Sequence, residues 1–142
     1  MKSDRRYVFD TNVIVSALLF RQSKPAQAFH FALDDRVILL SMPVLRELSE
    51  VLGRSKFDRY ILPSERERFL LALVTEAVFV PITEHLYVCV DPRDNKFLDL
   101  AVNGSAKCII TGDEDLSKLN PFRGIPIISA DSFLSSWRQL QP

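Results

Sequence analysis

The sequence predicts an α/β fold, with a parallel β-sheet covered on both faces by helices. Short, almost wholly apolar runs alternate along the chain with longer stretches of helical periodicity. Strands buried on both faces cannot alternate polar and apolar residues, so such runs are typical of a parallel sheet between two helical layers. The 142 residues and the 47% hydrophobic content suit one domain with a sizeable core. We therefore expect a single domain over residues 1–142.

The apolar runs and the stretches between them give the elements in order. The predicted strands lie at residues 7–9, 37–40, 77–80, 108–111 and 125–128. The predicted helices lie at residues 12–20, 25–35, 43–53, 63–74, 91–104 and 129–140.

Residues typical of helix ends support these boundaries. Pro43 suits a first helical turn, and Ser64 with Glu67 three residues later forms a capping-box pattern. Gly53 and Gly104 follow apolar-periodic segments, where a left-handed helix end favours glycine.

The charge balance indicates no extended basic surface. Eighteen Lys and Arg residues balance eighteen Asp and Glu residues, so a nucleic-acid partner would be attracted by local charge or by a bound cation. Cys89 and Cys108 lack a CxxC pair or histidines at zinc spacing, which favours two reduced thiols over a zinc site. No run of about 18 apolar residues occurs. We expect a cytoplasmic protein without membrane association.

Acidic residues near strand ends are the candidate functional residues. Asp10 closes the first predicted strand, and Asp113 follows the fourth in the stretch TGDED. Ligands of parallel sheets bind beyond the carboxyl ends of the strands, so these two carboxylates would face one crevice if their strands are neighbours. Glu47 lies beside the apolar stripe of the third predicted helix, and Asp94 lies near the start of the fifth.

Four carboxylates in one crevice would need a compensating charge. At about 4 Å and an effective dielectric constant of about 20, each like-charge pair costs about 4 kcal/mol. Oxygen ligands without His or Cys favour a hard ion, Mg²⁺ or Mn²⁺. Such an ion can orient a water for attack on a phosphodiester and neutralise the charge that develops.

Each acid also has a structural explanation. Asp10 suits the N-cap of the helix that follows it, and Asp94 suits the third position of a helix capped by Asp91, where an acid stabilises the helix dipole. Asp113 suits a turn beside glycine, and Glu47 suits a solvated helix face. For each acid taken singly, the structural explanation is the better one. For Asp10 and Asp113 together, at the ends of two central strands, a functional role is the better explanation.

Other conspicuous residues favour structural roles. His30 is typical of a packed helix residue and His85 of a loop residue. Phe133, Leu134 and Trp137 predict that the last helix packs on the sheet. The apolar stretches FHFAL (29–33) and FLLAL (69–73) would suit a dimer or partner interface. The basic residues in the middle of the chain alternate with acids, as on a solvated face: Arg54, Lys56, Arg59, Arg66 and Arg68.

Four separated motifs resemble the PIN-domain family of metal-dependent ribonucleases. They are VFDTNVIVSALLF (8–20), LRELSEVLGRSKF (45–57), DPRDNKFLDLAV (91–102) and IITGDEDL (109–116). Within that family the chain is similar to the toxin components of bacterial and archaeal toxin–antitoxin pairs, the VapC-like toxins.

The resemblance implies a three-layer α/β/α sandwich around a five-stranded parallel sheet in the order 3-2-1-4-5. It assigns the catalytic and metal-binding acids to Asp10, Glu47, Asp94 and Asp113, with Mg²⁺ or Mn²⁺ as cofactor. The supporting positions are Asn12, Thr111, Asp99 and Asp115, and Asp99 stands where this group usually has glutamate. The implied protein is an endoribonuclease toxin that cleaves RNA, has an antitoxin protein as partner and forms a homodimer.

Other functions fit the motifs less well. A haloacid-dehalogenase-like phosphatase also starts from an acid after strand one, but it needs a second acid two residues later, where this chain has Asn12. A response-regulator receiver needs an aspartate at the end of strand three, and AVFVPITE offers none. A PIN-like module that binds RNA or a protein without cleavage remains the main alternative, although a pure RNA binder would gain from removing negative charge near phosphates.

Overall fold

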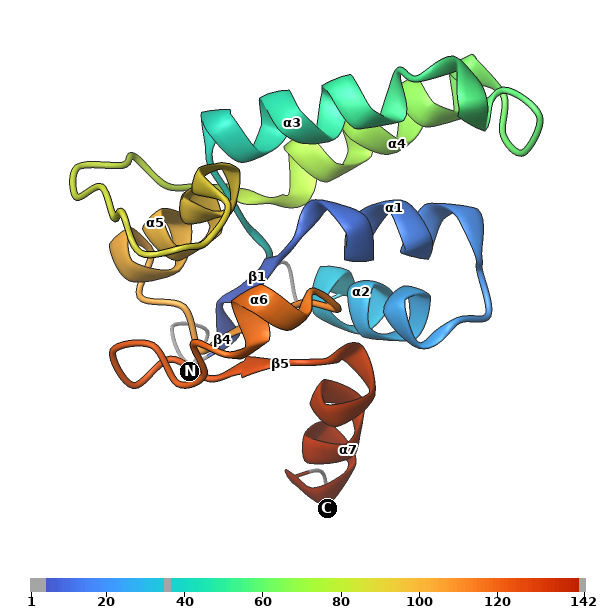
Figure 1. Ribbon diagram of the computed structural model, residues 1–142. Helices are drawn as coiled ribbons and strands as arrows, with labels where there is room; N and C mark the ends of the chain where they lie inside the picture. Colours follow the sequence, from blue (N-terminus) through green and yellow to red (C-terminus); the bar gives the residue numbers. More distant parts are fainter. Residues whose placement is uncertain (1–4, 35–36, 141–142) are drawn as a thin grey trace.

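Short strands and longer helices alternate along the chain, as the sequence predicts. The computed structural model describes residues 5–34 and 37–140 (Figure 1). The strands are β1 (Tyr7–Phe9), β2 (Leu39–Leu40), β3 (Val78–Phe79), β4 (Cys108–Ile110) and β5 (Ile127–Ile128). The α-helices are α1 (Thr11–Leu19), α2 (Lys24–Asp34), α3 (Met42–Leu52), α4 (Pro63–Glu76), α5 (Asn95–Asn103), α6 (Glu114–Ser117) and α7 (Ala130–Leu140). The 3-10 helices are η2 (Ser55–Phe57) and η3 (Pro92–Asp94).

The strands pair in parallel but are split over two sheets. One sheet has the order β1-β4-β5, and the other pairs β2 with β3. An isolated parallel bridge between Tyr7 and Ile38 joins them, and the Tyr7 N–H donates to the Val37 carbonyl at 2.9 Å. Across this bridge the order is β3-β2-β1-β4-β5. The parallel pairing and the adjacency of β1 and β4 are confirmed, whereas the described residues do not form one continuous five-stranded sheet.

β1 has its predicted bounds, whereas the other four strands are shorter than predicted because their apolar runs extend beyond the hydrogen-bonded ladder. At the predicted strand 125–128, Ile125 instead makes an antiparallel bridge to Phe122. Pro126 has no N–H to donate, so it contributes only its carbonyl, which accepts from the Ile109 N–H at 2.9 Å. β5 is therefore limited to two residues.

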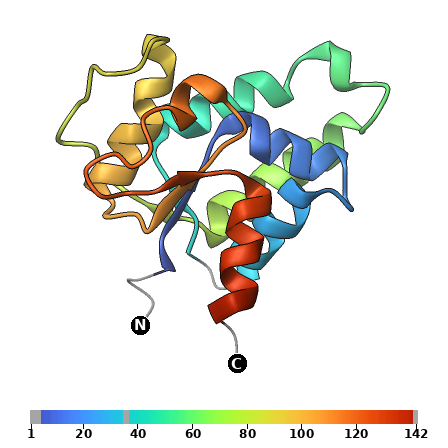
Figure 2. The same ribbon diagram turned by 60° about the horizontal axis from the view of Figure 1, so that its bottom comes forward.

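Helices cover both faces of β1. The rings of Tyr7 and Phe9 pack edge-on against Phe133 of α7, with centroids 4.9 and 6.4 Å apart, and Phe9 also packs on Phe29 of α2. Val8, between them in the strand, is fully buried on the opposite face, where α5 contacts the strands. Figure 2 shows α5 and α7 on either side of the strands. The predicted packing of the last helix is confirmed through Phe133 and the buried Leu134, while the side chain of Trp137 lies outside the described structure.

α4 begins at Pro63, as predicted, but the predicted capping box is wrong. Leu62 occupies the N-cap position without a side-chain cap, and Pro63 is the first helical residue, where its fixed φ and missing N–H are well tolerated. Ser64 therefore lies inside the helix, and the capping box that it would form with Glu67 is not the start of α4.

The glycines at helix ends differ from the prediction in their conformation. Gly53 and Gly104 end α3 and α5, but their φ angles of −79° and −93° lie in the right-handed region. After Gly104 the next residue, Ser105, has a positive φ of 53°. Close packing explains Gly104, because a Cβ there would lie 2.6 Å from Leu39 Cδ1 and 2.9 Å from the Leu100 carbonyl.

Arg66 also differs from the prediction, since it is buried instead of solvated. Its Nη1 donates to the Leu52 carbonyl at 2.8 Å and to the Arg54 carbonyl at 3.2 Å, and its Nη2 pairs with Asp58. The side chain thus satisfies carbonyl groups at the end of α3, which have no partners within the helix. Within residues 5–34 and 37–140, no helix is long and apolar enough to cross a membrane.

Candidate active site

Asp10 and Asp113 meet at one edge of the sheet because they follow the carboxyl ends of two paired strands. Phe9 pairs with Ile110 in the ladder, and the Asp10 N–H donates to the Ile110 carbonyl at 3.1 Å. Asp10 is buried, with 5% of the residue exposed. Its Oδ1 accepts a hydrogen bond from the Val13 N–H at 2.8 Å, which confirms that Asp10 is the N-cap of α1.

Thr111 links the two acids. Its buried hydroxyl donates to Asp10 Oδ2 and accepts from the Asp113 N–H at 3.0 Å. Asp113 Oδ2 in turn accepts from the Leu116 N–H at 3.0 Å and caps α6. The short helix α6 was not predicted, and the turn expected at Asp113 is the start of that helix.

Glu47 is held by two residues from other elements. The Thr11 hydroxyl, at the start of α1, donates to Glu47 Oε2, and Lys96 Nζ, in the first turn of α5, lies 2.7 Å from Glu47 Oε1. The exposed fractions of the Lys96 and Glu47 side chains are only 18% and 24%. Sequence analysis missed both partners, because neither a threonine inside DTN nor a lysine inside DNKF is distinguished by its spacing.

Asp94 lies where η3 passes into α5. Asp91 caps η3 through its Oδ1, which accepts from the Arg93 N–H at 2.9 Å, and Pro92 is the first residue of the turn, as predicted. The Arg93 guanidinium pairs with Asp91, with Nη2 3.0 Å from Oδ2. Asp94 makes no capping bond to α5 with its side chain, so the carboxylate is available to the pocket.

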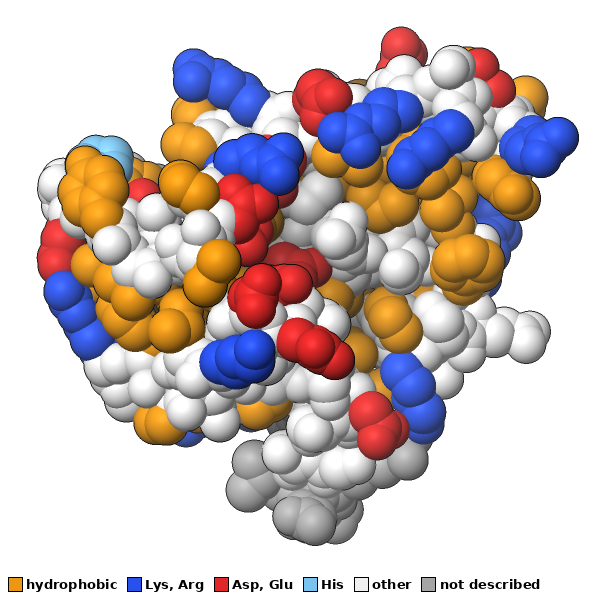
Figure 3. Space-filling model, in the orientation of Figure 1, with side chains coloured by type: hydrophobic (Ala, Val, Ile, Leu, Met, Phe, Trp, Pro, Cys, Tyr) orange, Lys and Arg blue, Asp and Glu red, His pale blue; other side chains and the backbone are white. Residues whose placement is uncertain are grey.

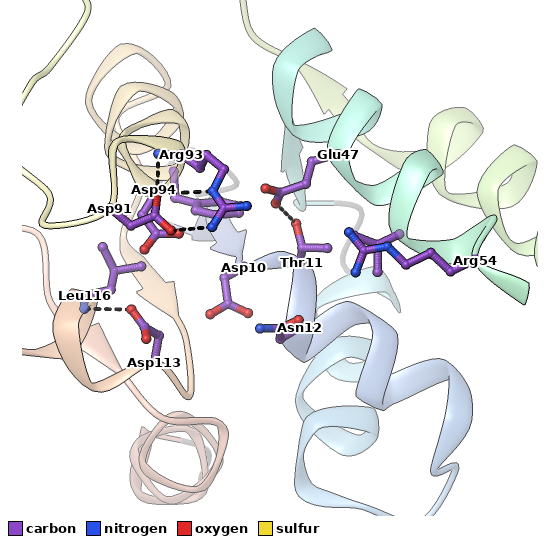
Figure 4. Close-up of a pocket in the computed structure, with 12 residues that line it drawn as sticks. Asp10, Thr11, Asn12, Glu47, Arg54, Asp91, Arg93, Asp94, Asp113 and Leu116 are labelled. Atoms are coloured by element: carbon purple, nitrogen blue, oxygen red, sulfur yellow. Dashed lines mark hydrogen bonds and ion pairs between the residues drawn. The ribbon is translucent and has the colours of Figure 1, made fainter. Parts of the chain in front are cut away.

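These side chains line one pocket of about 270 Å³ (Figure 4). Its predicted members are Asp10, Asn12, Glu47, Asp94 and Asp113. The polar members that sequence analysis did not assign to the site are Thr11, Arg54, Asp91 and Arg93. Apolar walls come from Val51, Phe97 and Leu116. Figure 3 shows acidic side chains gathered around a hollow in the middle of this face.

Three supporting residues do not line this pocket. Thr111 lies behind it and acts through Asp10. Asp99 holds the loop before η3, because its Oδ1 accepts from the Leu86 N–H at 2.7 Å and its Oδ2 lies 3.5 Å from His85 Nδ1. Asp115 is exposed on α6 and lies 3.8 Å from Lys118 Nζ.

Burial and mutual repulsion disfavour the charged forms of two of the acids. Desolvation raises the pKa of Asp94 to about 6, and the charges of Asp113, Asp91, Glu47 and Asp10 add to the effect. Burial also raises the pKa of Asp10, against the hydrogen bonds from Thr111 and Val13, while the charges of Asp113 and Glu47 raise it further. A cation in the pocket would relieve this repulsion.

The donor set fits a hard divalent ion in its chemistry. Carboxylate oxygens are the ligands that Mg²⁺ and Mn²⁺ prefer, and Cys89 and Cys108 are free thiols whose pKa values burial raises to about 11 and about 12. Within the part of the chain that the structure describes, no three His, Cys, Asp or Glu side chains form a ready cluster for a metal ion. Ligation would therefore need side-chain rotation or added water ligands.

Known proteins place the chain in a family. Residues 6–115 match the model of the PIN domain. The chain belongs to the PIN domain family. This PIN domain is also similar to the uncharacterized protein MJ1680 of Methanocaldococcus jannaschii, with 30% identity over 116 residues that make up 80% of this chain and 74% of that protein.

Membership of the PIN domain family indicates a general class of function. PIN domains are typically nucleases, which bind nucleic acid and generally use divalent metal ions. The matched residues 6–115 include every acid that lines the pocket. The resemblance to PIN domains expected from the sequence is confirmed, and the toxin subgroup stays a prediction.

Proposed function

We propose that this PIN domain is a metal-dependent endoribonuclease that hydrolyses RNA phosphodiester bonds with Mg²⁺ or Mn²⁺. The observation that carries the proposal is the convergence of Asp10, Glu47, Asp94 and Asp113 on one open pocket at the carboxyl ends of β1 and β4. Ligands of parallel α/β sheets bind at this position. The raised pKa values of Asp10 and Asp94 are also typical of functional sites.

The roles follow from how each side chain is held. Asp10, Asp94 and Asp113 would hold the divalent ion, which when bound supplies positive charge at the phosphate and lowers the pKa of a water. Thr111 fixes the Asp10 carboxylate through its hydroxyl. Asn12 is exposed at the mouth of the pocket, and its amide suits a hydrogen bond to a phosphate or ribose oxygen.

Positive side chains at the rim support an RNA substrate. Arg54 and Arg93 line the same pocket as the acids, and each is already paired with an acid, Arg54 with Glu50 at 3.0 Å and Arg93 with Asp91 at 3.0 Å. Exposed pairs of this kind are weak, so phosphates can compete for the guanidinium groups.

The biological role that we infer is that of a cytoplasmic toxin whose antitoxin is a separate protein, with residues 1–142 forming one nuclease domain. We also infer a homodimer. Exposed apolar side chains on and before α4 support that assembly, namely Leu62 at 59%, Leu71 at 68% and Val74 at 36% exposure. The other candidate stretch is less suitable, since Phe29 and Ala32 are buried in the core.

A binding module without cleavage is the second candidate. Both carboxylate oxygens of Asp10 and of Glu47 already accept hydrogen bonds within the protein, which favours a role that does not need them as metal ligands. The two candidates differ in whether RNA is cut.

Asp113→Asn tests the proposal. Asparagine caps helices as well as aspartate, so α6 and the fold should persist, while a metal-ligand charge is lost. We expect cleavage of an end-labelled single-stranded RNA in Mn²⁺ to fall by about 100-fold or more, the scale on which one group that stabilises transition-state charge acts. Asp10→Asn should behave in the same way, and chelation of the metal should stop the wild-type reaction.

Asp115→Asn is the matched control, because Asp115 lies on the same helix but outside the pocket. It should cleave at the wild-type rate. Wild-type protein that binds RNA but cuts none in Mg²⁺ or Mn²⁺ would establish the binding module, and cleavage that survives both pocket substitutions would move the active site elsewhere.

A further inference from the structure

Glu47 differs from Asp10, Asp94 and Asp113 in that a positively charged side chain of the protein is paired with it. Lys96 Nζ lies 2.7 Å from Oε1, and the Thr11 hydroxyl occupies Oε2. Glu47, Lys96 and Thr11 come from α3, α5 and α1, so their contacts connect three helices that border the pocket. Both charged side chains are more than three-quarters covered, with exposed fractions of 18% for Lys96 and 24% for Glu47.

The cations around the pocket are distributed unevenly over its acids. Arg93 pairs with Asp91 at the exposed rim, and Lys96 pairs with Glu47 further in. Among the described residues, no ion pair is formed by the remaining three acids that line the pocket, Asp10, Asp94 and Asp113. The negative charge that a divalent ion would neutralise is thus concentrated on these three.

We propose that Lys96 takes the place of a second metal ion at Glu47, so that the pocket binds one divalent ion, on the side of Asp10, Asp94 and Asp113. Lys96 is then a positioning residue, and Glu47 acts through its fixed carboxylate instead of as a metal ligand. This inference rests on the proposed metal-dependent nuclease and specifies how many ions that nuclease needs.

Charge and geometry both favour Lys96 over a second metal ion as the partner of Glu47. A metal ion that bound Glu47 would have to displace Nζ from Oε1, and it would leave an ammonium group beside a divalent cation in a largely buried site, where like charges repel strongly. The lysine is also anchored: it follows Asp94 and Asn95 in the first turn of α5, and its Nζ lies 5.9 Å from the centre of the Phe97 ring, which is itself buried.

Mn²⁺ titration of the RNA-free protein, with unbound Mn²⁺ followed by electron paramagnetic resonance, tests the inference without any cleavage assay. Wild type should bind one ion per chain. Lys96→Met removes the ammonium and keeps the apolar stem, so Glu47 becomes free to ligate and a second ion should bind. Lys96→Arg should restore the stoichiometry of one ion, because the guanidinium keeps a cation at Glu47.

Substitutions of the acids separate ligands from positioned residues. Glu47→Gln should leave the Mn²⁺ affinity within about 3-fold of wild type, whereas Asp113→Asn should lower it by more than about 10-fold, the scale for disturbing a metal site. Lys118→Met is the control for loss of a lysine, since Lys118 is exposed and pairs with Asp115 outside the pocket. A purely structural salt bridge would change thermal stability but would leave the number of bound ions at one.

The outcomes distinguish this inference from the proposed function. Two ions of similar affinity in wild type, a single ion in Lys96→Met, or an equal loss of affinity in Glu47→Gln and Asp113→Asn would each overturn the role of Lys96 and leave a metal-dependent nuclease standing. Wild-type protein that binds no Mn²⁺ would overturn the proposed function and this inference with it.

Discussion

At the scale of single residues, Asp10 combines a local structural role with a place in the candidate site. Its Oδ1 caps α1 through the Val13 N–H, a bond over three residues that the sequence predicts. Its Oδ2 accepts from Thr111, 101 residues away. The cap can be recognised in the sequence, because it involves residue types close together in the chain. The bond to Thr111 cannot, because it depends on β1 and β4 being neighbours. The two explanations of this acid are therefore compatible, because they use different oxygens.

Residue partners are the part of the site that the sequence predicts least. The acids could be identified as candidate site residues because they follow apolar runs or match positions of the family motifs. Lys96 lies 49 residues from Glu47, and nothing in the intervening sequence fixes their distance. Such pairs are set by how α3 and α5 pack, which a single sequence does not encode in any local periodicity.

Asp94 gives the first prediction at this scale. Its folded pKa of about 6 lies above the ordinary value of 3.8. The folded protein therefore holds a proton that the unfolded chain has lost, and the stability of the metal-free protein falls as pH rises from about 4 to about 6. Asp94→Asn lacks this penalty and should be more stable than wild type at pH 7.5, by up to about 1 kcal/mol after solvent screening, or about 2–4 °C in Tm.

Thermal unfolding in a chelator at pH 3.5 and pH 7.5 measures the effect. The difference in Tm between Asp94→Asn and wild type should be small at pH 3.5, below the ordinary pKa of 3.8, and appear at pH 7.5. Added Mn²⁺ at pH 7.5 should reverse its sign, because the wild-type carboxylate would then contribute to metal binding. An identical difference at both pH values would mean that the charge of Asp94 is not the cause.

At the scale of elements, order and type were predictable and exact pairing was not. Every predicted strand and helix has a counterpart, because apolar runs and helical periodicity extend over several residues. The short elements η2 and α6 were missed, since three or four residues are too few to show a period. The division into two sheets was also missed. The apolar residues of the two strands do not show where the hydrogen bonds between β1 and the segment of β2 stop.

The end of α3 depends on a residue from another helix, and Arg66→Met should show it. Methionine keeps the apolar stem but leaves the carbonyls of Leu52 and Arg54 without the donors that Arg66 provides. Losing donors to buried carbonyl groups costs about 1–3 kcal/mol, so we expect a loss of that size in the free energy of unfolding, measured by urea denaturation.

Arg68→Met is the matched comparison on the same helix. Arg68 is exposed, and substitutions at such positions change stability by less than about 0.5 kcal/mol. Equal effects of the two substitutions would show that Arg66 does not support the end of α3. Because Arg54 lines the pocket, Arg66 also connects the stability of this helix end to the position of a rim guanidinium.

At the scale of the whole molecule, charge is balanced in number but separated in space. The chain carries no net charge, yet acids line the pocket while Lys and Arg side chains lie along the upper part of the same face (Figure 3). The segment that follows Arg54 at the pocket rim exposes Lys56, Arg59 and Tyr60, the last with an exposed fraction of 68%, around a second hollow of about 570 Å³. Basic side chains beside an exposed aromatic ring are typical of single-stranded nucleic-acid binding.

This separation predicts that RNA enters along η2 before it reaches the acids. In an Asp113→Asn background, where RNA should stay intact, Lys56→Glu with Arg59→Glu should weaken RNA binding. The slope of log affinity against log salt concentration should become shallower by about 0.7 for each phosphate that the protein no longer neutralises. Lys24→Glu changes a charge beside α7, where Lys24 pairs with Asp131 at 3.8 Å, and should leave the slope unchanged. Fluorescence anisotropy at several salt concentrations measures both, and equal slopes for all variants would place the RNA path on another surface.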